Sequence, residues 1–222
     1  YTPTVTPITV TPTDKVSADV QNVPQTQTPT FDLRNDKTAE ITSKKLVDPA
    51  TGQPTDETTV TVAGEGTYTI DPTTGAVTFT PEKDFVGTAT GVTVQATATI
   101  TNADGKTATI TSDATYTPTV VAAVPTAKPA TSKDIQGATQ TGKPVFTEGD
   151  SRVPMNDDVP ATFDDGSTTK TVEGVGTYTV APDGTVTFVP EKSFVGTAPA
   201  VTVVREDKNG TKASATYTPT VT

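Results

Sequence analysis

The sequence predicts an all-β protein with two tandem antiparallel β-sandwich domains that form an elongated pair. Long motifs occur twice in the same order, which indicates duplication of a unit near 100 residues. Short segments alternate polar and apolar residues, which is the pattern of half-buried strands. Threonine is the commonest residue, with 54 of 222 positions, and no segment keeps a helical period.

The pentapeptide Tyr-Thr-Pro-Thr-Val marks the ends of the repeats. It occurs at Tyr1–Val5, Tyr116–Val120 and Tyr217–Val221. We therefore expect repeat one at residues 6–120 and repeat two at 121–222. The first copy opens the chain, so residues 1–5 are expected to be the terminal strand remnant of a preceding repeat. Pro125 and Pro129 are expected to stiffen the connection between the repeats.

Composition excludes several function classes. The chain has no His, Cys or Trp, and its net charge is −10. Without Cys no disulfide can form. The acidic balance disfavours nucleic acid and anionic membranes as partners, because no basic patch offsets phosphate repulsion. The 222 residues contain no signal peptide, no sorting motif and no apolar span of about 18 residues, so no membrane insertion is expected of them.

Two hairpins are predicted in each repeat. In repeat one, Thr67–Ile70 and Ala76–Thr80 flank the turn Asp71–Gly75, and Ala181–Gly184 is the matching turn of repeat two. Proline at the first turn position, an aspartate and a glycine are typical of such turns. Two further alternating segments, Thr59–Val62 and Gly91–Val94, are also expected to be strands.

The second hairpin ends each repeat. It runs from Val92 to Tyr116 across Asn102–Gly105, and from Val201 to Tyr217 across Asp207–Gly210. Each arm is four residues longer in repeat one. Equal, even lengthening keeps every side chain on its own face of the sheet. This pattern predicts a long hairpin that closes on Tyr-Thr-Pro-Thr-Val.

The N-terminal third of each repeat is less regular. Lys15–Phe31 matches Ala130–Phe146 loosely, and turns are expected at Asp48–Gly52 and Asp164–Gly166. The order of these strands does not follow from the sequence.

Carboxylates are the remaining candidates for catalysis or metal binding, since no His or Cys is present. Glu82 and Glu191 recur in both repeats, and their expected role is that of solvated turn residues. The acidic pairs lack the spacing of a calcium loop and have no counterpart in repeat one. No catalytic, cofactor-binding or metal residues are therefore predicted, and no cofactor. The other carboxylates considered are Asp84, Glu148, Asp150, Asp157, Asp158, Asp164 and Asp165.

Aromatic residues recur at equivalent positions, and they could form a core or stack on a sugar. A core is the expected use, because each repeat has few other large apolar groups. The set comprises Tyr68, Phe79, Phe85 and Tyr116 with their counterparts Tyr178, Phe188, Phe194 and Tyr217.

An internal Lys–Asn amide bond is not expected, because no Asn recurs in a strand of both repeats. The asparagines lie at positions 22, 35, 102, 156 and 209. Gly64 and Gly66 lie between two expected strands, which excludes a dinucleotide-binding loop.

The run Gly66–Gly87, followed by Asp-Gly and the closing pentapeptide, resembles the CshA-type fibril repeat of streptococcal cell-wall-anchored surface adhesins. Repeat two resembles it more closely, through Gln140–Asp150, Pro160–Phe163 and Asp165–Lys170. The resemblance covers nearly the whole chain. It implies a secreted, wall-anchored fibril of a Gram-positive cell, built from many repeats.

The resemblance implies adjacent repeats of the same chain as partners. Host surface or matrix proteins would bind other regions of the parent protein. We therefore predict that the chain is not an enzyme and is part of the stalk of an adhesive fibril. The alternative is a binding module in which the repeats themselves engage a host protein, a glycan or a neighbouring fibril. A binding module should expose an apolar or aromatic patch shared by both repeats, and a spacer should not.

Overall fold

The structure is a computed structural model, and it describes residues 1–35 and 37–222. The chain divides into two compact units, Tyr1–Ala122 and Ala123–Thr222. The described residues form strands, turns and loops, with no helix. The predicted all-β class is therefore confirmed. Tyr1–Val5 precedes the first strand and forms none itself, and its origin from a preceding repeat stays a prediction.

The first unit contains two facing sheets. One has the order β10-β12-β11-β5-β6, with β2 on the other side of β12, and the second has the order β3-β9-β8-β7. A short antiparallel pair, β1 and β4, forms a separate two-stranded sheet. The strands are β1 (Thr9–Thr13), β2 (Lys15–Val20), β3 (Gln25–Gln27), β4 (Thr30–Arg34), β5 (Ala39–Asp48), β6 (Gln53–Pro54), β7 (Thr59–Val62), β8 (Gly66–Ile70), β9 (Val77–Pro81), β10 (Gly87–Thr88), β11 (Val92–Thr101) and β12 (Thr107–Val121).

The second unit repeats this plan in a shorter form. Its sheets have the orders β14-β23-β22-β17, with β21 beside β23, and β15-β20-β19-β18. A short pair, β13 and β16, matches β1 and β4. The strands are β13 (Thr126–Lys128), β14 (Ala130–Asp134), β15 (Gln140–Gly142), β16 (Val145–Thr147), β17 (Thr162–Phe163), β18 (Thr169–Val172), β19 (Gly176–Val180), β20 (Val186–Pro190), β21 (Gly196–Thr197), β22 (Val201–Glu206) and β23 (Lys212–Val221).

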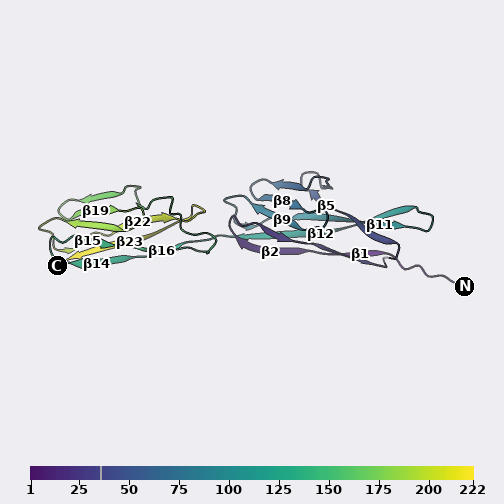
Figure 1. Ribbon diagram of the computed structural model, residues 1–222, viewed down its shortest axis with the longest axis horizontal. Helices are drawn as coiled ribbons and strands as arrows, with labels where there is room; N and C mark the ends of the chain where they lie inside the picture. The colour runs from purple at the N-terminus through teal and green to yellow at the C-terminus, as the bar shows by residue number, and fades with distance from the viewer. Residues whose placement is uncertain (36) are drawn as a thin grey trace. The chain divides into compact units, whose positions relative to one another are not determined.

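The hydrophobic core of each unit lies between its two sheets. In Figure 1, β8 and β9 lie over β12 and β2, and β19 lies over β23 and β14. Along β8 and β9 the first, third and fifth residues are buried and the residues between them are not, and β19 and β20 show the same alternation. The predicted half-buried strands are therefore confirmed.

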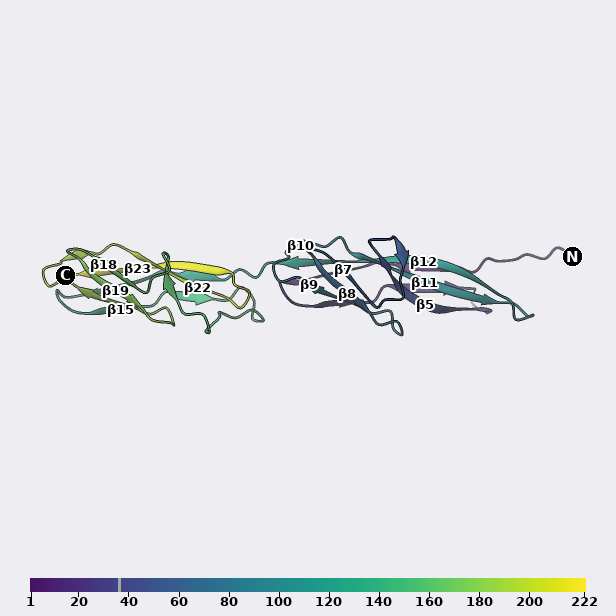
Figure 2. The ribbon, with the colours of Figure 1, turned by 90° about the horizontal axis from the view of Figure 1, so that it is seen from above.

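Both predicted hairpins are present in both units. Tyr68 pairs with Phe79 across the first hairpin, and Val92 pairs with Tyr116 across the second. Val201 likewise pairs with Tyr217. Figure 2 shows the longer β11–β12 hairpin of the first unit. Its extra residues pair with β5, which runs for ten residues, whereas the matching strand β17 has two.

One element of the topology departs from a purely antiparallel sandwich. β2 pairs with β12 in parallel, from Lys15 opposite Tyr116 to Val20 opposite Val121. β14 pairs with β23 in the same way, beginning with Ala130 opposite Tyr217. Such pairs join segments about 100 residues apart, so no local pattern reveals them.

The expectation that Pro125 and Pro129 form a connection between the repeats is wrong. They flank β13, and β13 pairs with β16 inside the second unit. The residues before Thr126 are therefore already part of that unit from Ala123 onward.

Threonines cover the outer face of the four-stranded sheet. Thr26, Thr78, Thr69 and Thr59 form one row across β3, β9, β8 and β7. Neighbouring hydroxyls bond across the strands, as between Thr26 and Thr78 at 2.9 Å. β-Branched residues with a hydroxyl suit an exposed strand position, because they fit the pleat and remain hydrated.

Candidate functional site

The recurrent aromatic residues are placed in the cores. Tyr68, Phe79 and Tyr116 are fully buried, as are Tyr178, Phe188 and Tyr217. Phe85 and Phe194 are partly buried and pack against the same clusters. The interpretation as core residues is confirmed, and the rings are not available to stack on a sugar.

Three of the four buried tyrosine hydroxyls, those of Tyr116, Tyr178 and Tyr217, form hydrogen bonds. Tyr178 donates its hydroxyl hydrogen to the Pro199 carbonyl oxygen at 2.6 Å. Burial raises the pKa of Tyr178 to about 12, and the nearby Tyr217 adds to that rise. Burial also raises the pKa values of Tyr116 and Tyr217, against a hydrogen bond to a serine that lowers each. At neutral pH all of these phenols are protonated and act as structural donors.

The candidate carboxylates are solvent-facing, and several form ion pairs. Lys170 Nζ lies 2.6 Å from Asp164 Oδ1 and 3.6 Å from Asp165 Oδ2. The hydrogen bond from Lys170 lowers the pKa of Asp164, and hydrogen bonds from Ser167 lower that of Asp165. Exposed pairs of this kind are screened by solvent and contribute little to stability.

The other candidate carboxylates are likewise paired with a basic side chain or exposed to solvent. Arg205 of β22 pairs with Asp157 at 2.8 Å, and Lys208 of the following turn pairs with Asp158 at 3.2 Å, so these two carboxylates hold a loop against the β22–β23 hairpin. Asp150 pairs with Arg152 at 3.0 Å. Asp84, Glu148, Glu82 and Glu191 are exposed. Within residues 1–35 and 37–222, no three acidic, His or Cys side chains gather in a group that could hold a metal ion.

One buried carboxylate was missed by sequence reasoning. Asp207 is fully buried at the tip of the β22–β23 hairpin, where its Oδ1 accepts hydrogen bonds from the backbone N–H groups of Asn209 and Thr211, each at 2.9 Å. Its counterpart, Asn102, caps the longer hairpin through the N–H groups of Asp104 and Lys106. Asp207 is therefore a turn-stabilising residue, and the sequence signal was its place at the start of an Asp-x-x-Gly turn.

The asparagines do not support an internal amide bond. Asn22, Asn35 and Asn102 are exposed, and Asn156 and Asn209 are partly exposed. A Lys–Asn bond needs a dry core to form, and none of these side chains lies in one.

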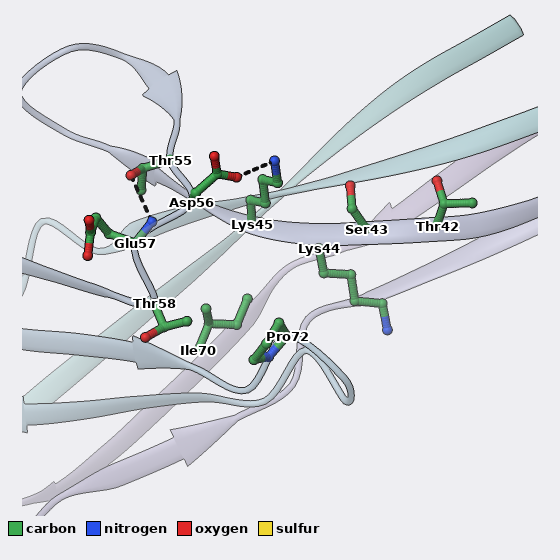
Figure 3. A pocket seen from close by; sticks show the side chains of 10 residues that line it. All are labelled: Thr42, Ser43, Lys44, Lys45, Thr55, Asp56, Glu57, Thr58, Ile70 and Pro72. Carbon is green, nitrogen blue, oxygen red and sulfur yellow. Dashed lines mark hydrogen bonds and ion pairs between the residues drawn. The ribbon is translucent and has the colours of Figure 1, made fainter.

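A hollow with a volume near 270 Å³ lies at the open edge of the first unit (Figure 3). Lys45 and Asp56 form an ion pair on one side of it, with Lys45 Nζ 2.6 Å from Asp56 Oδ1, and this bond lowers the pKa of Asp56. Lys44 points to the other side, toward the Thr74 carbonyl oxygen at 3.4 Å. The remaining lining residues are Thr42, Ser43, Thr55, Glu57, Thr58, Ile70 and Pro72.

This hollow has little to offer a ligand or a reaction. Asp56 is ionised and already paired, and the lining contains no aromatic ring. It is formed by the middle segment of the first unit, where the two repeats differ most. A ligand common to both repeats cannot be recognised there.

Ten large apolar residues of the described chain are exposed, and one pair of them occupies equivalent positions in the two repeats. Tyr1 is the one exposed aromatic residue in the described part of the chain. Val86 and Val195 occupy equivalent positions and are 47% and 58% exposed. Single valines of this kind are normal on protein surfaces and do not make an interaction patch.

A family model described as the surface adhesin CshA repetitive domain matches residues 7–120 and again residues 122–221. The chain belongs to this family. It therefore consists of two CshA repeats, which come from an adhesin family and not from an enzyme family, and whose place is the outer cell surface.

Similar solved structures include repeat domain 13 of the fibrillar adhesin CshA from Streptococcus gordonii. It is 58% identical, with a match that covers 32% of this chain and 90% of that chain at a TM-score of 0.20. No curated protein matches the chain.

Two cadherin structures also match over most of the chain. Mouse cadherin-23 EC22-24 is 14% identical over 94% of this chain, and Drosophila N-cadherin EC1-3 is 16% identical over 94%, each with a TM-score of 0.33. The chain spans 62% and 64% of the length of these two proteins. Superpositions this weak do not define a shared overall fold.

No helix in the described residues has the length and hydropathy to cross a membrane.

Proposed function

We propose that these CshA repeats are stalk elements of a bacterial adhesive fibril, and that they project a distal binding region away from the cell wall. The observation that carries this proposal is the burial of every recurrent aromatic residue, six of them completely. In the described residues the outer surface is Thr-rich and acidic, and Val86 and Val195 are the one pair of exposed apolar residues that both repeats share.

In this proposal the repeats give the fibril length and carry out no reaction. In each unit the closing strand is the longest of the described strands, with 15 residues in β12 and 10 in β23, and at roughly 3.3 Å per residue they span about 50 and 33 Å. A tandem array gains length with each copy, since each repeat needs contact only with its neighbours. A net charge of −10 supports solubility of an exposed array.

The finer assignments follow from this role. The parent protein would be anchored to the wall of a Gram-positive cell, and its ligand would bind regions outside these repeats. The repeats would have adjacent repeats as their partners, and no nucleic acid or membrane.

Small-angle scattering of the 222-residue chain tests the proposal. A stalk requires a radius of gyration well above the roughly 17 Å of a compact globule of this length. A value near 17 Å, with the repeats folded against one another, would contradict it. The same measurement at high salt is the control, because it shows whether charge repulsion alone extends the pair.

A further inference from the structure

In each repeat the strand near the start and the strand at the end are direct neighbours. β2 runs parallel to β12 over six paired residues, and the Gln21 N–H continues the ladder to the Val121 carbonyl oxygen at 2.8 Å. In the second repeat β14 runs parallel to β23 over five paired residues. There the ladder continues from the Gln136 N–H to the Thr222 carbonyl oxygen at 2.9 Å.

The parallel direction decides how this ladder responds to tension along the chain. Tension pulls the first strand backward at its start and the last strand forward at its end. The hydrogen bonds lie between the strands, across the line of force, so all of them are sheared together. In an antiparallel pair both loaded ends would lie at one end, and the bonds would be peeled one after another.

A buried polar network joins the same strands through their side chains. In the second repeat, Ser132 of β14 donates its hydroxyl hydrogen to Gln140 Oε1 at 2.6 Å and lies 2.6 Å from the Tyr217 hydroxyl. Because a serine hydroxyl has one hydrogen, the tyrosine is the donor in the second bond. Gln140 Nε2 then donates to the Thr220 carbonyl oxygen of β23 at 3.0 Å.

The first repeat holds the same network. Ser17, Gln25 and Tyr116 take the three roles, and Gln25 Nε2 donates to the Thr119 carbonyl oxygen at 2.9 Å. Gln25 and Gln140 are 5% and 4% exposed. Burying an amide is costly unless it is hydrogen-bonded, so its retention in both repeats calls for a specific gain.

The pentapeptide motif fits this arrangement. Its tyrosine supplies the hydroxyl, and its valine is buried. On the side of β12 away from β2, the pairing partner changes at the proline of the motif. β12 pairs with β11 up to Tyr116 and with β10 from Thr119. The missing N–H of Pro118 therefore breaks no bond there, while its carbonyl oxygen accepts a hydrogen bond from Ala89 at 2.9 Å.

We propose that the parallel ladder and its Ser–Gln–Tyr network form a mechanical clamp that keeps each repeat folded under tension. The clamp rests on the proposed stalk function, since a stalk carries the load on its binding region. The strand β13 precedes the clamp and pairs with β16 over three residues. Its release does not extend the repeat while β14 stays bound to β23.

Single-molecule stretching of the full chain, held at its two ends, tests the clamp. The first repeat releases roughly 40–50 Å more chain than the second at about 3.3–3.6 Å per residue, so each unfolding event can be assigned. Tyr217→Phe should raise the unfolding rate of the second repeat at constant force at least about fivefold, as expected for one lost hydrogen bond of ordinary strength. The first repeat is the internal reference.

Tyr178→Phe is the matched control. It also removes one buried tyrosine hydroxyl, but that hydroxyl bonds the Pro199 carbonyl and lies outside the clamp. Both variants should lower the melting temperature. Under force the control should change the unfolding rate less than twofold, because its hydrogen bond is still intact when the clamp breaks. Equal acceleration by both variants would overturn the clamp.

A change of pulling direction gives a second test. The chain has no Cys, so Gln136→Cys provides a single attachment point at the far end of β14. Force between residue 136 and residue 222 loads the ladder from one end and should unfold the repeat at a clearly lower force. Equal forces in both directions would exclude a shear clamp.

The failure of this proposal is distinguishable from the failure of the stalk. Repeats that are extended in scattering but unfold easily end to end would leave the stalk standing and remove the clamp. A chain that is compact in scattering but resists end-to-end force would remove the stalk and leave the clamp standing.

Discussion

At the scale of single residues, each repeat depends on an aromatic pair at its centre. The rings of Tyr178 and Phe188 lie 4.7 Å apart, and those of Tyr68 and Phe79 lie 4.8 Å apart. With a hydrophobic fraction of 32%, the chain has few other side chains of this size. These aromatic rings therefore supply much of the buried apolar surface of each core.

Phe188→Ala should destabilise the second repeat by about 3–5 kcal/mol, since it removes a fully buried ring and leaves a cavity. Chemical denaturation measures this loss. Val189→Ala is the control, because Val189 is 51% exposed in the same strand and should change stability by less than about 0.5 kcal/mol. A Phe188 variant as stable as the parent would place this ring outside the core.

The buried tyrosines also predict how stability depends on pH. An unfolded tyrosine has a pKa near 10, whereas folding raises that of Tyr178 to about 12. This stabilisation is complete below pH ~10 and is lost as pH rises toward ~12. Asp183 affects stability at the acidic end of the pH range. Hydrogen bonds from Thr185 and then Lys143 lower its pKa to about 2, so its contribution is lost as pH falls through that value.

Between these limits no histidine or cysteine titrates. The melting temperature should therefore be nearly constant from pH ~5 to ~9 and fall on both sides. In Tyr178→Phe the alkaline fall should be shallower. A marked change of stability between pH 6 and 8 would show a coupled group that the described residues do not reveal.

At the scale of elements, the hairpins could be predicted because their signals are local. Alternation located β8 and β9, and the even lengthening of both arms gave the register of β11 and β12. The turn type was less predictable. Asn102–Gly105 contains an Asp-Gly pair, but the N–H of Asn102 bonds to Lys106 and only Gly105 has positive φ, at +78°. This geometry is a longer turn with a bulge.

The N-terminal third could not be ordered from its residues. The partner of β2 lies about 100 residues away, and the parallel direction has no signature in either strand. The Ser–Gln–Tyr network was missed for the same reason. Its serine and glutamine are eight residues apart, but its tyrosine belongs to the closing motif, so only the fold brings the three together.

Gly176 at the start of β19 should tolerate no side chain. Its φ is +155°, and a Cβ there would lie 2.4 Å from the Val189 carbonyl oxygen. Gly176→Ala should therefore cost more than the roughly 1–2 kcal/mol of an ordinary left-handed position. Gly166→Ala is the matched control, with φ of +82° and open space around it. Equal losses in thermal unfolding would exclude the close approach.

At the scale of the whole molecule, the acidic pairs are expected to be solvated turn residues and not ligands. Melting of the chain in chelator and in millimolar Ca²⁺ should give the same transition, because Asp164 and Asp165 are already paired with Lys170. Mg²⁺ at the same concentration controls for ionic strength. A large rise with Ca²⁺ alone would mean that these carboxylates bind the ion.

The two repeats alone should be poor adhesins. Their recurrent aromatics are buried, Val86 and Val195 are the one exposed pair of large apolar residues at matching positions in the described residues, and the net charge of −10 opposes acidic host glycans. Salt screens that repulsion within about 8–10 Å. Immobilised chain should bind host matrix proteins no tighter than the high micromolar range, on the order of −5 kcal/mol.

The Lys44→Ala variant tests the polar hollow of the first repeat and should bind no differently. Saturable sub-micromolar binding to one purified ligand, lost on changing one surface patch, would replace the stalk with a binding module, because a spacer has no patch to lose.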